Sequence, residues 1–310
     1  MRERVLKAVS GLGYEPHVIA QSLRSGRTNT LGFLIGDISN PVFADVIRGA
    51  EDYARDRGFA VMLTNSEGEA RLDAEHLRLF LRRKVDGILL STSEVGSAEI
   101  AKALSKPAVP YVVLDRDIPD GSTVSTVCGD HAIGMREATA HLLSRGHRRI
   151  ALISGSPALR PARARAEGFR AAFKSAGLKL ADDLIRTGSL APDFGKQEVT
   201  SLLASANPPS AIIAGGNRLL GGVLEAVHQA GRLVGRDLAL ISCDDVDLTR
   251  LYLPPISVVI RDMYEMGRTA CELLLDRIVH PDSPPRTVTL PTRLLVRASS
   301  NFSWPPAGQR

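Results

Sequence analysis

From residue 30 onward, short apolar runs alternate with longer amphipathic stretches. The first runs are 30–36 ("TLGFLIG"), 59–65 ("FAVMLTN") and 85–91 ("VDGILLS"), and apolar residues at helical spacing mark 41–58 and 69–84 between them. Strands as apolar as these are buried on both faces, and strands that alternate with helices pair in parallel through right-handed crossovers. The pattern predicts an α/β fold with a doubly wound parallel sheet.

The same alternation starts again after residue 130. A chain of 310 residues is longer than one compact core usually serves. We therefore expect two doubly wound parallel-sheet lobes, with a ligand cleft outside the carboxyl ends of the strands. The expected later strands are 149–154, 184–187, 210–215, 238–243, 256–260, 286–290 and 293–297, and the last helix is 264–279. Residues 301–310 are expected to form a disordered tail.

Positive charge is concentrated at the start of the chain. Residues 1–30 contain five basic and two acidic residues, which accounts for more than half of the net charge of +5. A cationic block of this kind is typical of a surface that meets phosphates, although a solvated terminal face is the simpler alternative. Within it, 18–28 ("VIAQSLRSGRT") has the pattern of a two-turn amphipathic helix, which is only marginally stable alone in water.

Motifs for enzymatic chemistry are incomplete in this chain. The stretch 188–197 lacks the spacing and the metal-binding hydroxyl of a phosphate loop, and Pro157 replaces the glycine that a nucleophile elbow needs. His141 and His147 are six residues apart, which is wrong for two metal ligands on one helix face. We therefore predict no enzyme activity, no catalytic residues, no metal site and no cofactor.

The cysteines and the hydropathy of the chain indicate the compartment in which the protein is expected to function. Cys128, Cys243 and Cys271 are widely separated and odd in number, so we interpret them as small core residues. No apolar run reaches the roughly 18 residues of a membrane span, and the start of the chain lacks an export signal. We expect a cytoplasmic protein without a membrane partner.

Motifs along most of the chain resemble one protein family. The run 13–59, which begins "GYEPHVIAQSLRSGRTNTLGFLIGDISNPVF", resembles the hinge and first lobe of the LacI/GalR family of bacterial transcriptional regulators. Further matching motifs follow in the family's order, among them "VPYVVLDRDIP", "HLLSRGHRRIALISG", "ARAEGFRAAFKSAGL" and "LPTRLLVRASS". Each motif alone is weak, but together they are specific and cover about residues 1 to 300.

This resemblance implies a domain organisation and a set of partners. It implies a periplasmic-binding-protein-like type I pair of lobes that dimerises side by side and binds a small effector in the cleft. The first lobe would comprise 29–130 and 262–290, and the second 131–261 and 291–300. Residues 1–28 would be a partial DNA-binding headpiece with its hinge helix. Effector binding would then order or release that helix.

The resemblance also assigns DNA contacts to the hinge. In the family, two hinge helices pair and enter the minor groove of operator DNA, where a leucine wedges into a base step. Unstacking that step costs a few kcal/mol, and the bent duplex offsets the cost because it contacts more protein surface. An ordinary linker helix docked on the first lobe is the alternative. His17 departs from the family's usual asparagine. The implied DNA-binding residues are Tyr14, His17, Ala20, Leu23, Arg24 and Arg27, with Leu23 as the wedge.

The start of the chain departs from the family pattern. Members normally begin further upstream, with the first two helices of a helix-turn-helix, whereas Met1 here falls at the third. The apolar stripe of that helix, Val5, Val9 and Leu12, has nothing upstream to cover it. Either the full gene product begins earlier, or the protein is a remnant that only senses a ligand. In the first case, residues 1 to about 28 are expected to be disordered or rearranged.

Several residues are candidates for the effector site. Phe43 matches a family aromatic that packs on the effector, although it could equally belong to the core. Asp115, Asp130 and Asp244 end predicted strands and match polar cleft positions, and Arg165 matches the arginine of the family's R-x-x-G-[FYW] motif. Carboxylates, a guanidinium and an aromatic face suit a polyhydroxylated ligand, because each buried hydroxyl needs a partner. A sugar or sugar derivative is therefore expected.

Two departures modify that expectation. This chain has Asn217-Arg218 where many members have Asn-Asp, and Arg261 where a glutamine or similar residue often stands. If both arginines point inward with Arg165, they favour an anion, because a guanidinium binds carboxylate or phosphate in a bidentate manner. A sugar acid or sugar phosphate is then expected, whereas Arg218 as a surface residue would leave the question open.

Three classes of function are compatible with this fold. The main prediction is a ligand-responsive DNA-binding regulator, a repressor as is commoner in the family, with operator DNA, an effector and a second copy of itself as partners. The alternative is a sugar-binding protein of the transport or sensing type without DNA-binding activity. A sugar-processing enzyme is opposed by the incomplete catalytic motifs.

Overall fold

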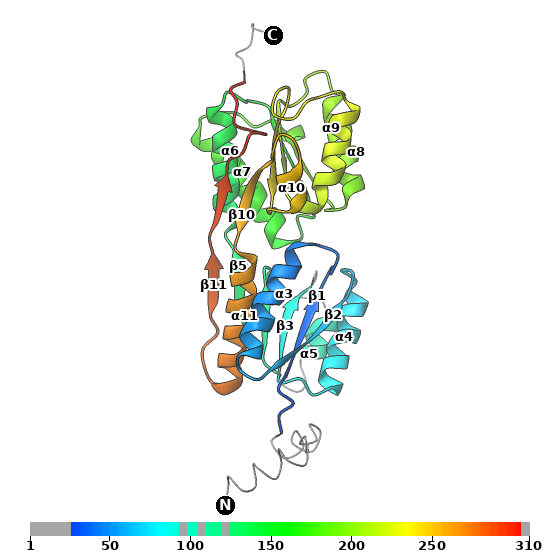
Figure 1. The fold of residues 1–310 in the computed structure, drawn as a ribbon, viewed down its shortest axis with the longest axis vertical. Coiled ribbons are helices and arrows are strands. Elements are labelled where there is room, and N and C mark those ends of the chain that lie inside the picture. The colour runs from blue at the N-terminus through cyan, green and yellow to red at the C-terminus, as the bar shows by residue number, and fades with distance from the viewer. Residues whose placement is uncertain (1–25, 93–97, 105–108, 119–123, 305–310) are drawn as a thin grey trace, which may run out of the picture.

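The computed structural model describes residues 26–92, 98–104, 109–118 and 124–304, which form two lobes stacked along the long axis of the molecule (Figure 1). Both lobes are α/β layers, and the chain runs through each of them more than once. The prediction for residues 1 to about 28 falls almost entirely outside the described residues. The fold class predicted from the apolar pattern, two doubly wound parallel-sheet lobes, is confirmed.

The first lobe is built on a parallel sheet of six strands. They are β1 (Thr30–Ile35), β2 (Ala60–Asn65), β3 (Gly87–Ser91), β4 (Tyr111–Leu114), β5 (Ser125–Gly129) and β11 (Thr287–Leu290), in the order β11-β5-β4-β3-β1-β2. Helices α3 (Val42–Arg55) and α11 (Met263–Val279) cover one face, and α4 (Ala70–Arg82) and α5 (Ala98–Leu104) cover the other. Leu31 and Phe33 pack towards α3 and α11, whereas Leu34 packs towards α4. Burial on both faces therefore explains the continuous apolar runs.

The second lobe repeats this plan. Its strands are β6 (Ile150–Gly155), β7 (Ile185–Gly188), β8 (Ala211–Ala214), β9 (Ala239–Cys243), β10 (Ser257–Arg261) and β12 (Thr292–Leu295), in the order β12-β10-β9-β8-β6-β7. Only the pairing of β12 with β10 is antiparallel among the described pairs. Helices α6 (His131–Ser144) and α7 (Arg160–Ser175) cover one face, and α8 (Pro192–Leu203) and α9 (Leu220–Gln229) cover the other. The short helix α10 (Asp247–Leu251) follows β9.

The chain passes between the lobes at three points. They lie between β5 and α6, between β10 and α11, and between β11 and β12. The carboxyl ends of the parallel strands in both sheets face the space between the lobes. This is where open α/β sheets bind their ligands.

Helix α11 is seated closely on α3. A Cβ atom at Gly267 would lie 1.8 Å from the carbonyl oxygen of Val46, and one at Gly49 would lie 2.0 Å from that of Tyr264. Only glycine permits this backbone approach. The contact matters for the site because α3 and the start of α11 both supply side chains to the space between the lobes.

The apolar pattern did not predict strand β5, although Asp130, the residue that follows it, was expected to end a strand. Its residues, "STVCG", are mostly small or polar, and all five are buried. Without a run of large apolar residues or an alternating pattern, the segment has no strand signal in the sequence. Its position between β4 and β11 is set by the sheet around it.

The predicted tail, 301–310, is only partly outside the fold. The Trp304 backbone N–H donates to the Arg145 carbonyl at 2.7 Å, and its ring centroid lies 5.3 Å from that of buried His147. Phe302 packs perpendicular to the same imidazole. Residues 301–304 therefore pack on the second lobe, because two aromatic side chains cover a buried histidine. Residues 305–310 lie outside the described residues.

Within the described ranges, each helix is too short or too polar to cross a membrane. Cys128, Cys243 and Cys271 are buried and unpaired. No cluster of three or more side chains suited to a metal ion occurs among the residues that the structure describes.

Candidate functional site

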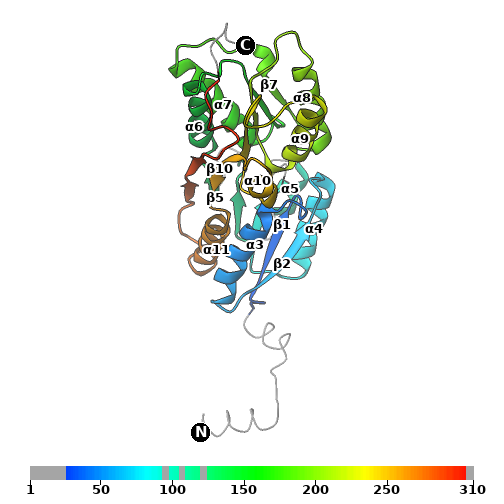
Figure 2. The same cartoon turned by 45° about the horizontal axis from the view of Figure 1, so that its top comes forward.

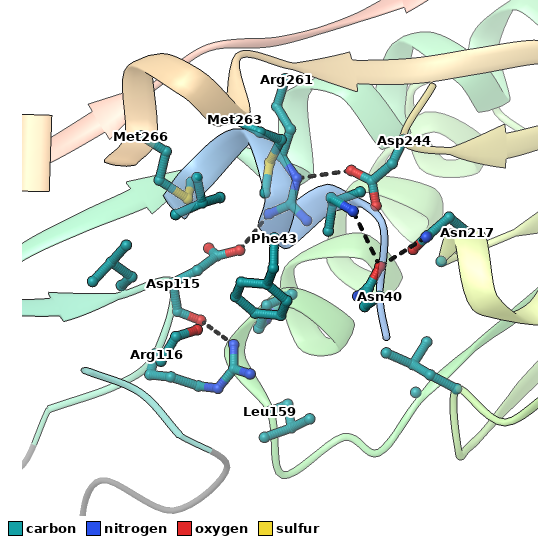
Figure 3. Close-up of a pocket in the computed structure, with 18 of the residues that line it drawn as sticks. Asn40, Phe43, Asp115, Arg116, Leu159, Asn217, Asp244, Arg261, Met263 and Met266 are labelled. Carbon is teal, nitrogen blue, oxygen red and sulfur yellow. Dashed lines mark hydrogen bonds and ion pairs between the residues drawn. The ribbon is translucent and has the colours of Figure 1, made fainter. Parts of the chain in front are cut away.

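A cavity lies between the two lobes at the carboxyl ends of their strands (Figure 3). Its volume is about 100 Å³, well above the roughly 10–15 Å³ that one water molecule needs. The cavity can therefore hold a small organic molecule. Its polar lining residues are Asn40, Ser91, Asp115, Arg116, Arg165, Asn217, Asp244 and Arg261.

Asp115 and Asp244 occupy equivalent places in the two lobes. Asp115 directly follows β4, and Asp244 directly follows β9. Both residues are buried, with exposed fractions of 6% and 5%. Both have a left-handed backbone, with φ of 55° and 67°. Aspartate tolerates this conformation better than most residues, and such backbone outliers concentrate at functional sites. Each lobe thus places one buried carboxylate at the cavity.

Arg261 connects these two carboxylates. Its Nη1 donates to Asp115 Oδ2 at 2.5 Å, and its Nε donates to Asp244 Oδ1 at 2.8 Å (Figure 3). Burial by itself lowers the pKa of Arg261, but the charges of Asp244 and Asp115 outweigh it and raise that pKa above its ordinary value. The guanidinium, at the end of β10, therefore ties the two lobes together across the cavity.

Asp115 has a second set of partners. His131 Nε2 lies 2.9 Å from both carboxylate oxygens, and the Gly129 backbone N–H donates to Oδ1 at 3.2 Å. Burial opposes ionisation of Asp115, but His131 and Arg261 outweigh it and hold its pKa well below the usual range. Burial lowers the pKa of His131 to about 4. At neutral pH His131 is therefore a neutral imidazole that donates from Nε2.

Asp244 keeps one oxygen available. Burial raises its pKa, but Arg261 and Arg165 more than offset this, so the carboxyl is ionised at neutral pH. Its Oδ1 accepts from Arg261, whereas Oδ2 accepts no hydrogen bond from the part of the chain that the structure describes. A ligand hydroxyl could donate to this second oxygen.

Two further arginines reach the cavity. Arg116 donates from Nε to the Thr92 carbonyl at 2.6 Å and from Nη1 to its neighbour's carbonyl, that of Asp115, at 2.9 Å. Arg165, on the first turns of α7, is 5% exposed. No carboxylate or carbonyl among the described residues pairs with its guanidinium, which interacts with the buried thiol of Cys243.

The remaining walls are apolar. Phe43 lies near the start of α3, and Figure 3 shows its ring extending across the cavity between the charged groups. The apolar lining also includes Leu114, Leu159, Leu190, Met263 and Met266. An aromatic face opposite polar groups suits a molecule that has both C–H and hydroxyl surfaces.

Contacts at the rim hold the lobes together. Asn217 Nδ2 donates to Asn40 Oδ1 at 2.8 Å, which joins the second lobe to the first. Two exposed ion pairs, Arg218 with Asp37 and Arg163 with Asp117, also join the lobes. The structure is therefore a closed arrangement of the two lobes.

The cavity gathers six of the eight predicted effector residues. Asp130 and Arg218 lie elsewhere. The Asp130 carboxylate accepts a hydrogen bond from the Ile133 backbone N–H at 3.2 Å and so caps α6. Arg218 forms an ion pair with Asp37 at the rim of the cavity. The six that line the cavity are Phe43, Asp115, Arg165, Asn217, Asp244 and Arg261.

Sequence reasoning missed several lining residues. Arg116 directly follows Asp115 at the end of β4, and Ser91 is the last residue of β3, so the position at a strand end was an available signal. Asn40 lies just before α3, in the loop that follows β1.

Of the predicted hinge residues, only Arg27 is described. Its Nη2 donates to the Ile278 carbonyl at 3.5 Å, near the end of α11. Thr28 continues this attachment, because its N–H donates to Asp86 and its hydroxyl to the Lys84 carbonyl. Tyr14, His17, Ala20, Leu23 and Arg24 lie outside the described residues.

Comparisons with known proteins place this chain in a family. Residues 139–300 match the model of the periplasmic binding protein-like domain. The chain is 32% identical to the ribose operon repressor of Escherichia coli strain K12 over 297 residues. The aligned region covers 96% of this chain and 90% of that protein. The chain belongs to the LacI family of transcriptional regulators.

Other LacI-family proteins show the same similarity. The repressor PurR of Glaesserella parasuis is 32% identical, over 92% of this chain and 84% of that protein. A LacI-family regulator from Enterococcus faecium with bound ribose is 30% identical, with a TM-score of 0.79 over 89% of this chain and 100% of that chain. The lac repressor dimer bound to operator, at 22% identity and a TM-score of 0.83 over 96% of this chain and 89% of that chain, supports the fold.

Proposed function

We propose that this LacI-family protein is a transcriptional repressor whose DNA binding responds to a small sugar or sugar derivative in the cavity between the lobes. The observation that carries the proposal is that both lobes supply residues to the lining of the cavity. Asn40 and Asp115 come from the first lobe, and Arg165, Asn217 and Asp244 from the second. A ligand that contacts both lobes favours their closed arrangement over any other, so it shifts the balance between conformations.

The lining favours a polyhydroxylated ligand. Asn40 and Asn217 offer amide groups, Asp244 Oδ2 offers an acceptor, and the Phe43 ring offers a face for sugar C–H groups. Buried hydroxyls need partners of this kind. The similarity to a ribose operon repressor and to a ribose-bound regulator supports the same class of ligand.

The attachment of the N-terminal segment links the cavity to DNA binding. Arg27 and Thr28 bond to the first lobe, at the end remote from the cavity (Figures 1 and 2). A hinge helix anchored there responds when the first lobe changes its position in a dimer, because a two-turn helix forms only if its anchors are suitably spaced. Such a repressor would act on operator DNA in the cytoplasm.

An exposed apolar surface supports a homodimer. Leu251 is 78% exposed and Leu253 is 83% exposed, and Leu248 lies beside them at the start of α10. In both views α10 lies on the same side of the molecule as α3 (Figures 1 and 2). Clusters of exposed leucines mark interaction sites. A second copy of the chain, packed along this side, would cover them.

An electrophoretic mobility shift assay tests the proposed function. The probe is the DNA upstream of the protein's own gene, and the proteins are the chain as printed and a form extended upstream by the in-frame codons. We expect the extended form to shift this probe, and a scrambled probe to remain unshifted. If the extended form does not shift the probe but retains sugar binding, the protein is a sugar-binding protein without DNA-binding activity.

A further inference from the structure

Two ion pairs join the lobes at the rim of the cavity. Arg218, in the short helical turn after β8, pairs with Asp37, in the loop after β1. Arg163, on α7, pairs with Asp117, in the loop after β4. These side chains are between 27% and 51% exposed, and none of them belongs to the lining of the cavity. We call the two pairs the rim clasp.

The first pair is prepared by the loop that carries Asp37. Its Oδ1 accepts from the Ser39 backbone N–H at 2.9 Å and from the Ser39 hydroxyl at 2.6 Å. These bonds fix the carboxylate and leave Oδ2 for Arg218. The acidic partner therefore stands in position within its own lobe, independently of the other lobe.

The second pair is prepared from the other side. Arg163 donates from Nη1 to the carbonyls of Pro157 and Ala158, at 3.1 and 2.9 Å, which leaves Nη2 for Asp117. Most exposed ion pairs are weak partly because two long side chains must be held in one geometry. In each clasp pair, one partner is already held by its own lobe, so closing the lobes costs less side-chain entropy.

The clasp lies away from the points about which the lobes can turn. All three crossovers leave the sheets at one edge, from β5 and β11 in the first lobe and from β10 and β12 in the second (Figure 1). Three of the four clasp residues follow β1, β8 or β6, which lie in the opposite half of their sheets. Rotation about the crossovers moves this half the most, so opening of the lobes separates the clasp.

Salt distinguishes the clasp from the buried ionic contact between the lobes. Arg261 binds Asp115 and Asp244 in the interior, where its side chain is 11% exposed. Mobile ions screen exposed charges strongly and buried charges much less. Added salt therefore weakens the clasp and leaves the contacts of Arg261 largely intact.

We propose that the rim clasp holds the lobes closed before an effector binds, so that effector affinity depends on ionic strength even for an uncharged effector. An exposed ion pair shifts an equilibrium by a factor of up to about five, and two pairs together by up to about 25-fold. The effector binds the closed arrangement, so its apparent affinity falls in proportion to the fraction of closed chains. This last step rests on the proposed function, whereas closure by the clasp does not.

Double electron–electron resonance on the effector-free chain measures closure directly. Nitroxide labels are placed on Glu69→Cys, at the start of α4, and on Asp193→Cys, at the start of α8. Both positions are exposed and follow β2 and β7, the strands furthest from the crossovers. The native cysteines are buried, so labelling is selective. Labelled chains are diluted with unlabelled ones, so that only distances within one chain are measured.

The native chain should be closed at low salt and should open as salt is added. We expect a short distance to dominate at about 50 mM NaCl and a longer one to gain population at about 500 mM. In the double variant Asp37→Asn with Asp117→Asn, the ratio of open to closed chains should rise by about 2- to 25-fold at low salt. Further salt should change it little. Circular dichroism checks that the variant is folded.

Asp183→Asn is the matched control. Its ion pair with Arg149 is also partly exposed, but both residues belong to the second lobe. The same change of charge is therefore made without touching a contact between the lobes. This variant should show the native distances at both salt concentrations.

Isothermal titration calorimetry extends the test to the effector. The panel contains D-ribose and D-glucose together with D-ribonate and D-gluconate, because the sequence is compatible with sugars and with sugar acids. For the neutral sugar that binds best, the affinity should fall from low to high salt by the same factor as the closed fraction. The double variant should show the lower affinity already at low salt.

The outcomes separate the clasp from the proposed function. A ratio of open to closed chains that changes neither with salt nor in the double variant overturns the proposal. A native chain that is open at low salt also overturns it. If Asp183→Asn opens the lobes as far as the double variant does, the cause is net charge and not the clasp. If no panel member binds, the proposed class of effector is contradicted, whereas the resonance measurement still decides whether the clasp closes the lobes.

Discussion

The Arg261→Gln variant is expected to have a free energy of unfolding about 3–5 kcal/mol lower than that of the native protein. The substitution removes the guanidinium that Asp115 and Asp244 share and leaves two buried carboxylates without their common partner. Breaking a buried ion pair from one side is costly because the remaining charge is still desolvated. Urea denaturation followed by circular dichroism measures the loss.

Arg218→Gln is the matched control for this prediction. Arg218 also forms an ion pair between the lobes, with Asp37, but its side chain is 40% exposed. An exposed pair contributes about 0–1 kcal/mol, so the control should lose little stability. Equal losses in the two variants would show that Arg261 is no more important than an exposed rim contact.

The stability of the native protein and of Arg261→Gln should also depend differently on pH. In the native protein the pKa values of Asp115 and Asp244 lie below their unfolded values. Their ionisation therefore stabilises the fold above about pH 4, the unfolded value, and this contribution is lost as the pH falls further. Without Arg261 these pKa values rise, so the variant loses at least part of this contribution and its deficit is largest at neutral pH. Denaturation at pH 7 and pH 4 should show the difference between the proteins narrowing in acid.

The Leu251→Glu variant is expected to weaken dimerisation by at least about a hundredfold. A buried leucine contributes roughly 1.5–3 kcal/mol, and a glutamate forced into the same apolar interface adds a desolvation penalty. Leu251 is 78% exposed in the single chain, so the substitution should leave the fold of the chain unchanged. Sedimentation equilibrium gives the dissociation constant.

Leu233→Glu serves as the control for dimerisation. Leu233 is also exposed but lies in the loop after α9, outside the α10 cluster. Its substitution should leave the dimer intact. If Leu251→Glu remains as dimeric as Leu233→Glu, the surface around α10 is not the dimer interface.

Much of the fold could be predicted because its strands are buried on both faces. Continuous apolar runs such as 30–36 identify such strands, and the helices between them have apolar residues at helical spacing. Strand β5 could not be predicted from the apolar pattern, because its small and polar residues are buried only by the strands and helices that surround them. The packing of residues 301–304 likewise depends on His147, far away in the sequence.

The candidate site was predictable where its residues end buried strands. Asp115 and Asp244 are of this kind, and both line the cavity. Asp130 also follows a strand, but a helix begins at the next residue, so its carboxylate caps that helix instead. Arg218 could not be placed, because its partner Asp37 is 181 residues away and no local pattern encodes a contact between lobes.

The proposed function predicts a coupling between the cavity and DNA. Fluorescence anisotropy would measure the affinity of the extended form for its upstream DNA, first alone and then with a saturating amount of the panel sugar or sugar acid that calorimetry finds to bind best. We expect the ligand to lower the affinity for DNA by about 5- to 150-fold, the usual range of allosteric coupling. An Asp244→Asn variant with weakened ligand binding should keep its DNA affinity and respond only at higher ligand concentration. A ligand that saturates the cavity and leaves the affinity for DNA unchanged would contradict the central claim.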